Sequence, residues 1–314
     1  MIDLDIVIVN WNTKLQLREC LLSIIPAITS PVLCLRQCIV VDNASEDGSA
    51  DGLENLLLPI VIIRNHENKG FAYACNQGAK AGKSEYILFL NPDFKLFPDS
   101  LVKALHFLDE ERNKQVGILG IQLVDGNGVI HRNVARFPTP RSLFFQMLGL
   151  DRLWPHRFPS HFMTDWNHHD SREVDQVTGA FYLVRRQVYE ELKGFDERFF
   201  MYFEDLDLAY RAKHAGWKSY YLADAQAFHS GGGASYQIKA KRLYYVLNSR
   251  VLFTAKHYGS LSAIKILIAS FFVEFWVRLG WSLANLSMKN FITTIQAYLL
   301  FLRNLPRLLR DLGK

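Results

Sequence analysis

Short apolar runs rich in β-branched residues alternate with helix-compatible segments through the first 121 residues of the chain. Each run is short and continuously apolar, which fits a strand covered on both faces of a sheet. The expected strands occupy residues 4–9, 38–41, 60–63, 86–90 and 116–121. The expected helices occupy residues 15–25, 50–57, 71–81 and 99–111. This order predicts an α/β fold with a mostly parallel sheet, in which ligands bind at the carboxyl ends of the strands.

The pattern changes after residue 121. Asp125-Gly126-Asn127-Gly128 has the composition of a tight hairpin turn. Residues 138–172 combine four prolines with histidines and aromatic residues and have no clear period, so we expect a long loop near the site. Beyond it we expect strands at 176–184 and 219–228, a helix at 204–215, and only helices from about residue 239.

Size and cysteine content limit the class of protein. A chain of 314 residues with 49% hydrophobic residues can bury a large core, and we expect one large domain, residues 1–235, with an appendage, residues 236–314. The four cysteines form no CxxC pair, which favours buried thiols in a reducing compartment. The apolar run at 4–9 is too short and too acidic in its flank for a signal peptide, so the chain is expected to fold in the cytosol.

Charge is concentrated at the carboxyl-terminal end. Residues 235–314 hold twelve lysines and arginines, but only Glu274 and Asp311 as acidic residues. Because this segment is also rich in Leu, Ile, Phe and Trp, a membrane interface is favoured over a nucleic acid. Glu274 and Arg278 lie four residues apart and can pair. A transmembrane span over 264–288 is the alternative, but these charges are costly at the bilayer centre, and an interfacial or protein-packed amphipathic helix is expected.

Two aspartates follow predicted strands in the first half. Asp42 can accept from a ribose hydroxyl or a base N–H, and the alternative is a plain Asx turn with a helix cap. Asp93, in Asn91-Pro92-Asp93, can ligate a divalent cation that bridges two phosphates, or it can simply form a turn. With Asn10 at the end of the first strand, these residues are expected at one edge of the sheet.

A second polar group lies further along the chain. Glu204 and Asp205 can supply a general base and Asp207 a structural partner, whereas an ordinary acidic first helical turn is the alternative. His229 precedes the glycine cluster 231–233, whose backbone amides can hold anionic oxygens. A core histidine is the alternative there. Together the four signals indicate an acid/base and metal–phosphate site.

These stretches resemble the inverting nucleotide-sugar glycosyltransferases of glycosyltransferase family 2, which have the GT-A fold. The resemblance covers about residues 4–235. Its motifs are Ile6-Val7-Ile8-Val9-Asn10-Trp11-Asn12, Val41-Asp42-Asn43-Ala44-Ser45, Asn68-Lys69-Gly70-Phe71-Ala72, Leu90-Asn91-Pro92-Asp93, Thr178-Gly179-Ala180, Glu204-Asp205-Leu206-Asp207-Leu208 with Arg211, and His229. Asn91-Pro92-Asp93 in place of Asp-x-Asp is most similar to the rhamnosyltransferase branch. The resemblance implies a Rossmann-like, mostly parallel sheet with helices on both faces, to which the charge pattern adds a helical, membrane-associating appendage.

The resemblance also implies roles for individual residues. Asp42 and the backbone near Asn10 and Asn12 would lie around the nucleobase and ribose, with Asn68, Asn76 and Gly179 as further donor-binding residues. Asp93 and His229 would hold Mg²⁺ or Mn²⁺ on the diphosphate. Asp205 would deprotonate the acceptor hydroxyl, with Glu204 as the second catalytic candidate.

The resulting hypothesis is a metal-assisted, inverting glycosyltransferase at the cytosolic face of the cell membrane. Transfer of L-rhamnose from dTDP-L-rhamnose to a polyprenyl-diphosphate-linked glycan of the bacterial cell envelope is the function that the resemblance implies. The expected partners are a nucleotide-sugar donor, a lipid-linked glycan acceptor and the membrane surface, without nucleic acid. The alternatives are transfer of another sugar from a UDP- or GDP-sugar, and a catalytically silent nucleotide-sugar-binding scaffold.

Overall fold

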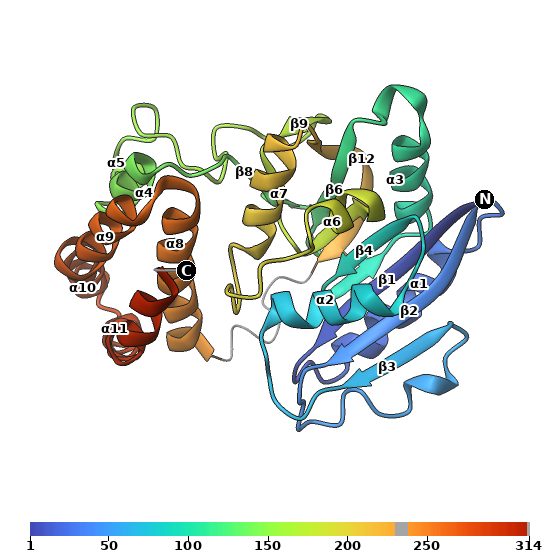
Figure 1. Cartoon of the computed structure of the whole chain (residues 1–314), viewed down its shortest axis with the longest axis horizontal. Helices are drawn as coiled ribbons and strands as arrows, with labels where there is room; N and C mark the ends of the chain where they lie inside the picture. The colour runs from blue at the N-terminus through green and yellow to red at the C-terminus, as the bar shows by residue number, and fades with distance from the viewer. Residues whose placement is uncertain (230–237, 313–314) are drawn as a thin grey trace. The chain divides into compact units, whose positions relative to one another are not determined.

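The structure is a computed structural model, and it describes residues 1–229 and 238–312. Two compact units make up the chain (Figure 1). We name the first the sheet unit; it consists of Met1–Arg136, Trp166–Glu197 and Glu204–Ala234. The second, the helical unit, consists of Phe137–Asp165, Arg198–Phe203 and Ser235–Lys314. Segments 137–165 and 198–203 thus group with the carboxyl-terminal helices although they interrupt the sheet unit in sequence.

One mixed sheet forms the centre of the sheet unit, with its main strands in the order β3-β2-β1-β4-β11-β6-β12-β5. The strands are β1 (Ile2–Asn10), β2 (Leu33–Asp42), β3 (Ile60–Arg64), β4 (Tyr86–Leu90), β5 (Phe94–Leu96), β6 (Val116–Val124), β11 (Phe181–Arg185) and β12 (Lys218–His229). The first four in spatial order pair in parallel, as predicted. β11 lies antiparallel between β4 and β6, whereas β12 is parallel to β6 and antiparallel to β5.

Helices cover both faces of this sheet, and the burial pattern of the strands explains why. Successive side chains of a strand point to opposite faces. Leu4, Ile6 and Ile8 of β1 therefore join the core with α1 (Gln16–Ala27) and α3 (Ser100–Asp109). On the opposite face α2 (Phe71–Ala81) approaches β1 so closely that a Cβ at Gly78 would lie 2.4 Å from a methyl carbon of Val7. The predicted two-sided covering is confirmed.

Three local predictions differ from the structure. The helix expected at 50–57 is wrong: only a 3-10 turn, Leu53–Asn55, forms there, after Gly48 and Gly52 with positive φ. The strand expected at 176–184 is two strands, β10 (Gln176–Val177) and β11, because the chain turns at Thr178-Gly179-Ala180. The region 138–172 contains helices α4 (Pro140–Met147) and α5 (Leu150–Leu153). Thr139 caps α4 with a capping box, so helical structure has a local cause there.

The remaining elements complete the sheet unit. The turn at Asp125 forms the predicted hairpin between β6 and β7 (Ile130–His131). Helix α7 (Glu204–His214) confirms the predicted acidic helix. The other elements are β8 (Val134–Ala135), β9 (Arg172–Val174) and α6 (Arg186–Glu191).

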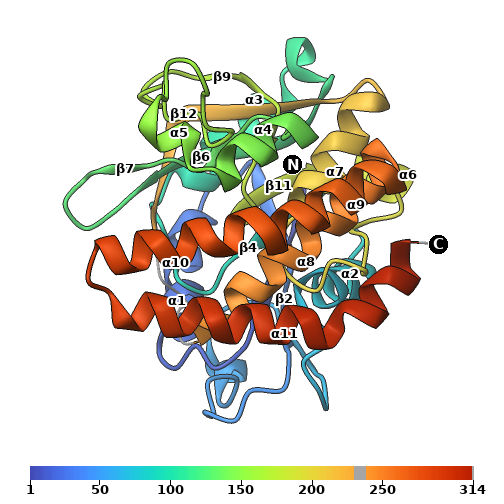
Figure 2. The same cartoon turned by 90° about the vertical axis from the view of Figure 1, so that its left-hand side faces the viewer.

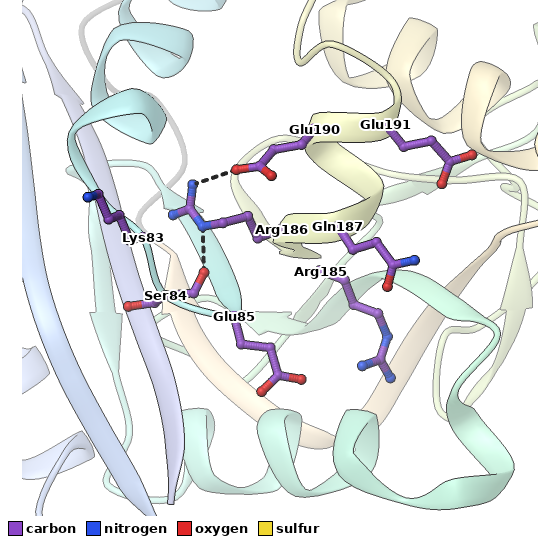
Figure 3. Close-up of a pocket in the computed structure, with 8 residues that line it drawn as sticks. All are labelled: Lys83, Ser84, Glu85, Arg185, Arg186, Gln187, Glu190 and Glu191. Atoms are coloured by element: carbon purple, nitrogen blue, oxygen red, sulfur yellow. Dashed lines mark hydrogen bonds and ion pairs between the residues drawn. The ribbon is translucent and has the colours of Figure 1, made fainter.

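A cavity of about 490 Å³ lies where β4 begins and β11 ends, at the edge of the sheet opposite the carboxyl end of β4 (Figure 3). Arg186, one of the residues that line it, makes three hydrogen bonds to other segments. It donates to the carbonyl oxygens of Ser84 at 2.5 Å and Ala79 at 3.1 Å, and to the Asp5 carboxylate at 2.9 Å. Because the guanidinium already joins β1, α2 and β4, we interpret this cavity as the surroundings of a structural clamp.

Four helical segments form most of the helical unit (Figure 2). They are α8 (Lys239–Tyr258), α9 (Ser260–Ala269), α10 (Phe275–Ala284) and α11 (Met288–Leu312). A π-helical turn, Ser270–Glu274, joins α9 to α10. The stretch Ser260–Ala284 is long and apolar enough to cross a membrane, with a mean hydropathy of 1.7 over its most apolar window. Length and composition alone do not distinguish a span from a packed helix.

An ion triad lies inside this unit, with Glu274 and Arg250 buried and Arg278 partly exposed. Glu274 contacts Arg250 of α8 at 2.5 Å and Arg278 at 2.7 Å, and Arg250 also donates to the Ser270 hydroxyl at 2.8 Å. The predicted Glu274–Arg278 pair is therefore confirmed. Burial would raise the pKa of Glu274, but the two guanidinium groups hold it below its ordinary value. Glu274 is thus satisfied within the protein, as expected for a protein-packed helix.

Candidate active site

The predicted site residues lie along one edge of the sheet. Asn10 and Asp42 end the parallel strands β1 and β2 and are in register with each other. The loop containing Asp93 follows the carboxyl end of β4, and His229 ends β12. β11 runs in the opposite direction, so its amino end, next to Gly179, reaches the same edge. A hydrogen bond of 3.0 Å from the Asn91 amide to the Ala180 carbonyl connects the two central loops.

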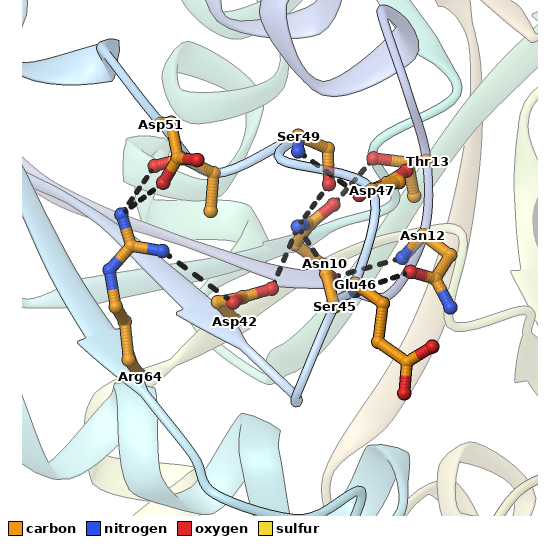
Figure 4. A network of polar contacts seen from close by, with 11 residues as sticks. Asn10, Asn12, Thr13, Asp42, Ser45, Glu46, Asp47, Ser49, Asp51 and Arg64 are labelled. Carbon is orange, nitrogen blue, oxygen red and sulfur yellow. Dashed lines mark hydrogen bonds and ion pairs between the residues drawn. The ribbon is translucent and has the colours of Figure 1, made fainter.

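Asn10 organises the loop that follows β2 (Figure 4). Its amide nitrogen donates to Asp42 Oδ1 at 2.9 Å, to Ser45 Oγ at 3.0 Å and to Ser49 Oγ at 2.8 Å. Its amide oxygen accepts from Thr13 Oγ1. Asn10 is fully buried, so its side chain supports this loop from inside the protein. Asp42 is 5% exposed, and its second oxygen lies 3.8 Å from the Arg64 guanidinium.

Asn12 and Asn68 make further hydrogen bonds to the loops that follow β2 and β3. The backbone amide of Asn12 donates to Ser45 Oγ at 3.0 Å, and the side-chain oxygen of Asn12 accepts from the backbone amide of Glu46 at 2.8 Å. Asn68 Oδ1 accepts from the buried Asn43 side chain at 3.0 Å and from the Gly70 amide at 3.0 Å. The polar groups at the ends of β1 and β2 therefore form one fixed surface.

Asp93 and His229 form a direct pair. His229 Nε2 lies 3.2 Å from Asp93 Oδ2, and both side chains are largely buried. The pairing follows from the strand register, because His229 of β12 is opposite Phe94 of β5 and their rings lie 4.5 Å apart. The ring of His131 is 5.8 Å from that of His229, and no sequence signal indicated this neighbour.

The carboxylate of Asp205 is held from three sides. Its Oδ2 accepts from the Gly179 amide at 2.7 Å, its Oδ1 accepts from the Leu206 amide at 2.8 Å, and the side chain of Gln176 also hydrogen-bonds to it. Burial raises the pKa of Asp205, and these hydrogen bonds offset part of the rise. Each carboxylate oxygen has two lone pairs, so an acceptor hydroxyl can still bind. A fixed carboxylate with a raised pKa is suited to general-base chemistry.

Glu204, the neighbouring carboxyl, is in a different environment. It is 5% exposed, and its Oε2 has no hydrogen-bond partner. Burial and the charges of Asp205 and Asp207 raise its pKa well above the ordinary value. The backbone reaches Glu204 through two residues with positive φ, Tyr202 at 68° and Phe203 at 70°. Such backbone strain in non-glycine residues is concentrated at functional sites in proteins.

Two other predicted residues are connected to the loop 192–197, Asn76 directly and Asp207 through Arg211. Asp207 forms an ion pair with Arg211 at 2.8 Å, and Arg211 donates to the carbonyl oxygens of Leu192 and Gly194. Asn76 donates to the Phe195 carbonyl and to Glu197, each at 2.9 Å, and its oxygen accepts from the Phe195 amide. The side chain of Asn76 therefore forms its hydrogen bonds within the protein.

The structure adds residues that the sequence patterns did not single out. Gln176 supports Asp205, Arg64 approaches Asp42, and His131 lies beside His229. The glycine cluster 231–233 lies outside the described residues. In the part of the chain that is described, no group of three or more His, Cys, Asp or Glu residues forms a metal cage.

The α/β sheet with helices on both faces and a carboxylate-lined edge agrees with the GT-A fold that the resemblance implied. The sequence model of the family described as glycosyl transferase family 2 matches residues 5–193. The chain belongs to that family, and the predicted resemblance is confirmed.

Two curated relatives narrow the branch. The chain is 27% identical over 270 residues to N-acetylglucosaminyl-diphospho-decaprenol L-rhamnosyltransferase of Mycobacterium tuberculosis, which covers 82% of this chain and 85% of that protein. It is 26% identical over 179 residues to the rhamnosyltransferase WbbL of Escherichia coli, covering 57% and 64% of the two chains. The rhamnosyltransferase-like character of the family match is thereby confirmed.

Solved structures share the fold. The mannosyltransferase of Pyrobaculum calidifontis in complex with GDP-Man and Mn²⁺ is similar with a TM-score of 0.55 and 14% identity, covering 95% of this chain and 86% of that one. A 1–349 fragment of TarS from S. aureus has a TM-score of 0.51 and 15% identity, covering 95% and 91%. At this identity the likeness concerns the fold alone.

Proposed function

We propose that this glycosyltransferase moves L-rhamnose from dTDP-L-rhamnose to a polyprenyl-diphosphate-linked glycan of the cell envelope, with inversion at the anomeric carbon. The observation that carries the proposal is that Gly179, which binds the Asp205 carboxylate, and Asp93, which pairs with His229, lie in two loops joined by the Asn91–Ala180 hydrogen bond. Two relatives that are rhamnosyltransferases support the sugar, and the decaprenol-diphosphate-linked acceptor of one of them supports the acceptor class.

Asp205 is the proposed general base. It accepts the proton of the acceptor hydroxyl while that oxygen attacks the anomeric carbon from the face opposite the leaving group. The bond from the anomeric carbon to the diphosphate breaks, and the nucleoside diphosphate leaves with the electron pair. The Gly179 amide orients the carboxylate during this step, since it already donates to Oδ2. Glu204 is the second candidate for the base.

Asp93 and His229 are the residues proposed to hold Mg²⁺ or Mn²⁺. A carboxylate oxygen and an imidazole nitrogen are both acceptable ligands for Mn²⁺, and the donor diphosphate can supply further oxygen ligands. His229 Nε2 and Asp93 Oδ2 are 3.2 Å apart, which is close enough for both atoms to bind the same cation. When bound, such a cation offsets the charge on the leaving diphosphate. The ring of Phe94 packs against that of His229 in a tilted arrangement, with the ring centres 4.5 Å apart.

The proposed donor pocket lies at the ends of β1 and β2. Asp42 and the backbone near Asn10 and Asn12 are placed around the nucleobase and ribose, with Asn68, Asn76 and Gly179 as further proposed donor-binding residues. The support is geometric. Asn10 fixes the Asp42 carboxylate through a 2.9 Å hydrogen bond, so a ribose hydroxyl would meet a preorganised acceptor.

The helical unit is proposed to dock on the cytoplasmic face of the membrane, where a lipid-linked acceptor resides. Large apolar side chains are exposed along its helices, and examples are Phe272 at 71%, Trp276 at 63% and Leu299 at 60%. Exposed apolar rows together with lysine and arginine are typical of interfacial anchors. In this proposal residues 1–235 form the catalytic part and residues 236–314 the part that docks on the membrane.

A thermal-shift panel of dTDP-, UDP- and GDP-sugars with Mg²⁺ or Mn²⁺ tests the donor. Stabilisation by a ligand increases with its affinity, so dTDP-L-rhamnose should give the largest shift. Preference for a UDP- or GDP-sugar would overturn the rhamnose assignment and favour transfer of another hexose. Binding without any transfer to a lipid-linked acceptor would favour the silent scaffold.

A further inference from the structure

A groove of about 420 Å³ lies between α4 and α9, both within the helical unit. Its floor and walls are mostly apolar, with Phe144, Ile266 and Ala269 among the lining residues. Two cationic side chains, Arg141 of α4 and Lys265 of α9, also line it. The groove therefore combines an apolar interior with positive charge contributed by two different helices.

The charge of the groove is not neutralised by nearby acids. Among the described residues that line it none is acidic, and no ion pair joins Arg141 or Lys265 to a carboxylate in the part of the chain that the structure describes. Arg141 lies over the ring of Phe145 at 5.3 Å, which leaves its guanidinium N–H groups available. A groove with two uncompensated cations is complementary to an anionic group.

An exposed apolar row begins beside the groove. Leu261, Ile264 and Ile268 of α9 are 68%, 43% and 52% exposed, and Phe272 and Trp276 continue the row at spacings of four. Residues three and four apart share one face of a helix, and the π-turn Ser270–Glu274 lies within this row. A ligand that fills the groove with its anionic end can therefore extend an apolar chain along α9.

We propose that this groove seats the phosphate headgroup of an anionic membrane phospholipid, with its acyl chain lying against the exposed row of α9. Arg141 supplies a planar, bidentate phosphate donor and Lys265 a point charge, while Phe144 and Ile268 contact the apolar part of the lipid. The inference rests on the proposed docking of the helical unit to a membrane, and it specifies where one lipid molecule binds.

Titration of the full chain with monomeric dihexanoyl phosphatidylglycerol tests the groove without any bilayer. The double variant R141Q/K265Q should bind this lipid on the order of tenfold more weakly, the scale of losing charge-assisted hydrogen bonds. The matched control is K289Q/R303Q, which removes one lysine and one arginine from exposed positions on α11. The control should bind like the wild type. Equal losses in both double variants would overturn the inference, because they would indicate diffuse attraction.

Two further measurements separate the sources of binding. Ile268→Ser should weaken binding of the lipid but not of inorganic phosphate; equal affinity of the wild type for inorganic phosphate and for the lipid would overturn the acyl-chain contact. Co-sedimentation with phosphatidylglycerol vesicles tests docking independently. If the wild-type protein binds the monomeric lipid but no vesicle, the docking proposal is wrong and the groove proposal stands. If R141Q/K265Q binds both vesicles and the monomeric lipid as the wild type does, the groove proposal is wrong and the docking proposal stands.

Discussion

The Asp205 carboxylate accepts a 2.7 Å hydrogen bond from the backbone amide of Gly179. This contact joins the first turn of α7 to the turn between β10 and β11, two segments 26 residues apart. Because a backbone amide cannot rotate away as a side chain can, the carboxylate keeps one orientation. A Cβ at position 179 would lie 3.4 Å from the carboxylate oxygen, which is an ordinary van der Waals contact, so it is the backbone amide and not the lack of a side chain that holds Asp205.

Asp205→Asn should reduce kcat by roughly 10²-fold or more, the usual scale for loss of a general base. Donor affinity should stay near the wild-type value, since the amide keeps the size of the carboxylate and Asp205 is not among the proposed donor contacts. Steady-state kinetics and donor titration measure the two effects. Near wild-type turnover would move the role to Glu204.

The activity of the wild type should fall as pH falls through the raised pKa of Asp205, because a protonated carboxyl cannot accept the hydroxyl proton. The acid limb of the kcat profile should therefore lie above the ordinary aspartate range of about 3.9. A kcat that stays constant down to that range would contradict Asp205 as the base.

Asp93→Ala and His229→Ala should weaken donor binding by about tenfold or more with Mg²⁺ or Mn²⁺ present, the usual scale when a metal site is disturbed. Both variants should match the wild type when EDTA is added. His131→Ala is the control, since its ring approaches that of His229 without reaching Asp93 in any described contact. Equal wild-type affinity with and without EDTA would argue against a bound cation.

Glu204→Gln should raise the melting temperature at neutral pH. The pKa of Glu204 is raised in the folded state, so the folded protein binds that proton more tightly than the unfolded chain does. The associated stability is present below the unfolded pKa of about 4.3 and is lost as pH rises through the folded pKa. The stability gained by the variant should thus grow as pH rises from about 4.3. Exposed Glu54→Gln should show no such trend, and a variant destabilised at every pH would refute the argument.

Glu274→Gln should lower the free energy of unfolding of the helical unit by about 3–5 kcal/mol, because it leaves buried Arg250 without its counter-charge. Denaturant unfolding monitored by far-UV circular dichroism measures the loss. Donor binding to the sheet unit should be unchanged at low denaturant. A change below about 1 kcal/mol, the range of surface ion pairs, would show that the triad is not buried in solution.

Asn76→Leu should lower the free energy of unfolding by about 1–3 kcal/mol, since it leaves the buried Phe195 amide and carbonyl without partners. Denaturant unfolding and donor titration should be measured together. Selective loss of donor affinity at unchanged stability would instead place the Asn76 side chain at the nucleotide.

The local sequence pattern was sufficient to predict the order of strands and helices. It also predicted the edge of the sheet at which Asn10, Asp42 and Asp93 lie, because strand ends follow directly from where apolar runs stop. It was also sufficient for α7, whose acidic first turn and basic last turn suit the helix dipole. It failed at residues 50–57, where the two glycines with positive φ and the hydrogen bonds around Asp47 favour a looped backbone over a helix.

Only the tertiary structure decided which partners the polar side chains bind within the protein. Asn10 and Asn76 carry the same amide, yet the former fixes Asp42 and the latter binds Phe195, 119 residues away. The pairing of Arg250 with Glu274 likewise depends on two helices packing together. The sequence determines the type and order of these groups through local periodicity. Their partners depend on contacts between distant segments, which form only when the strands and helices pack.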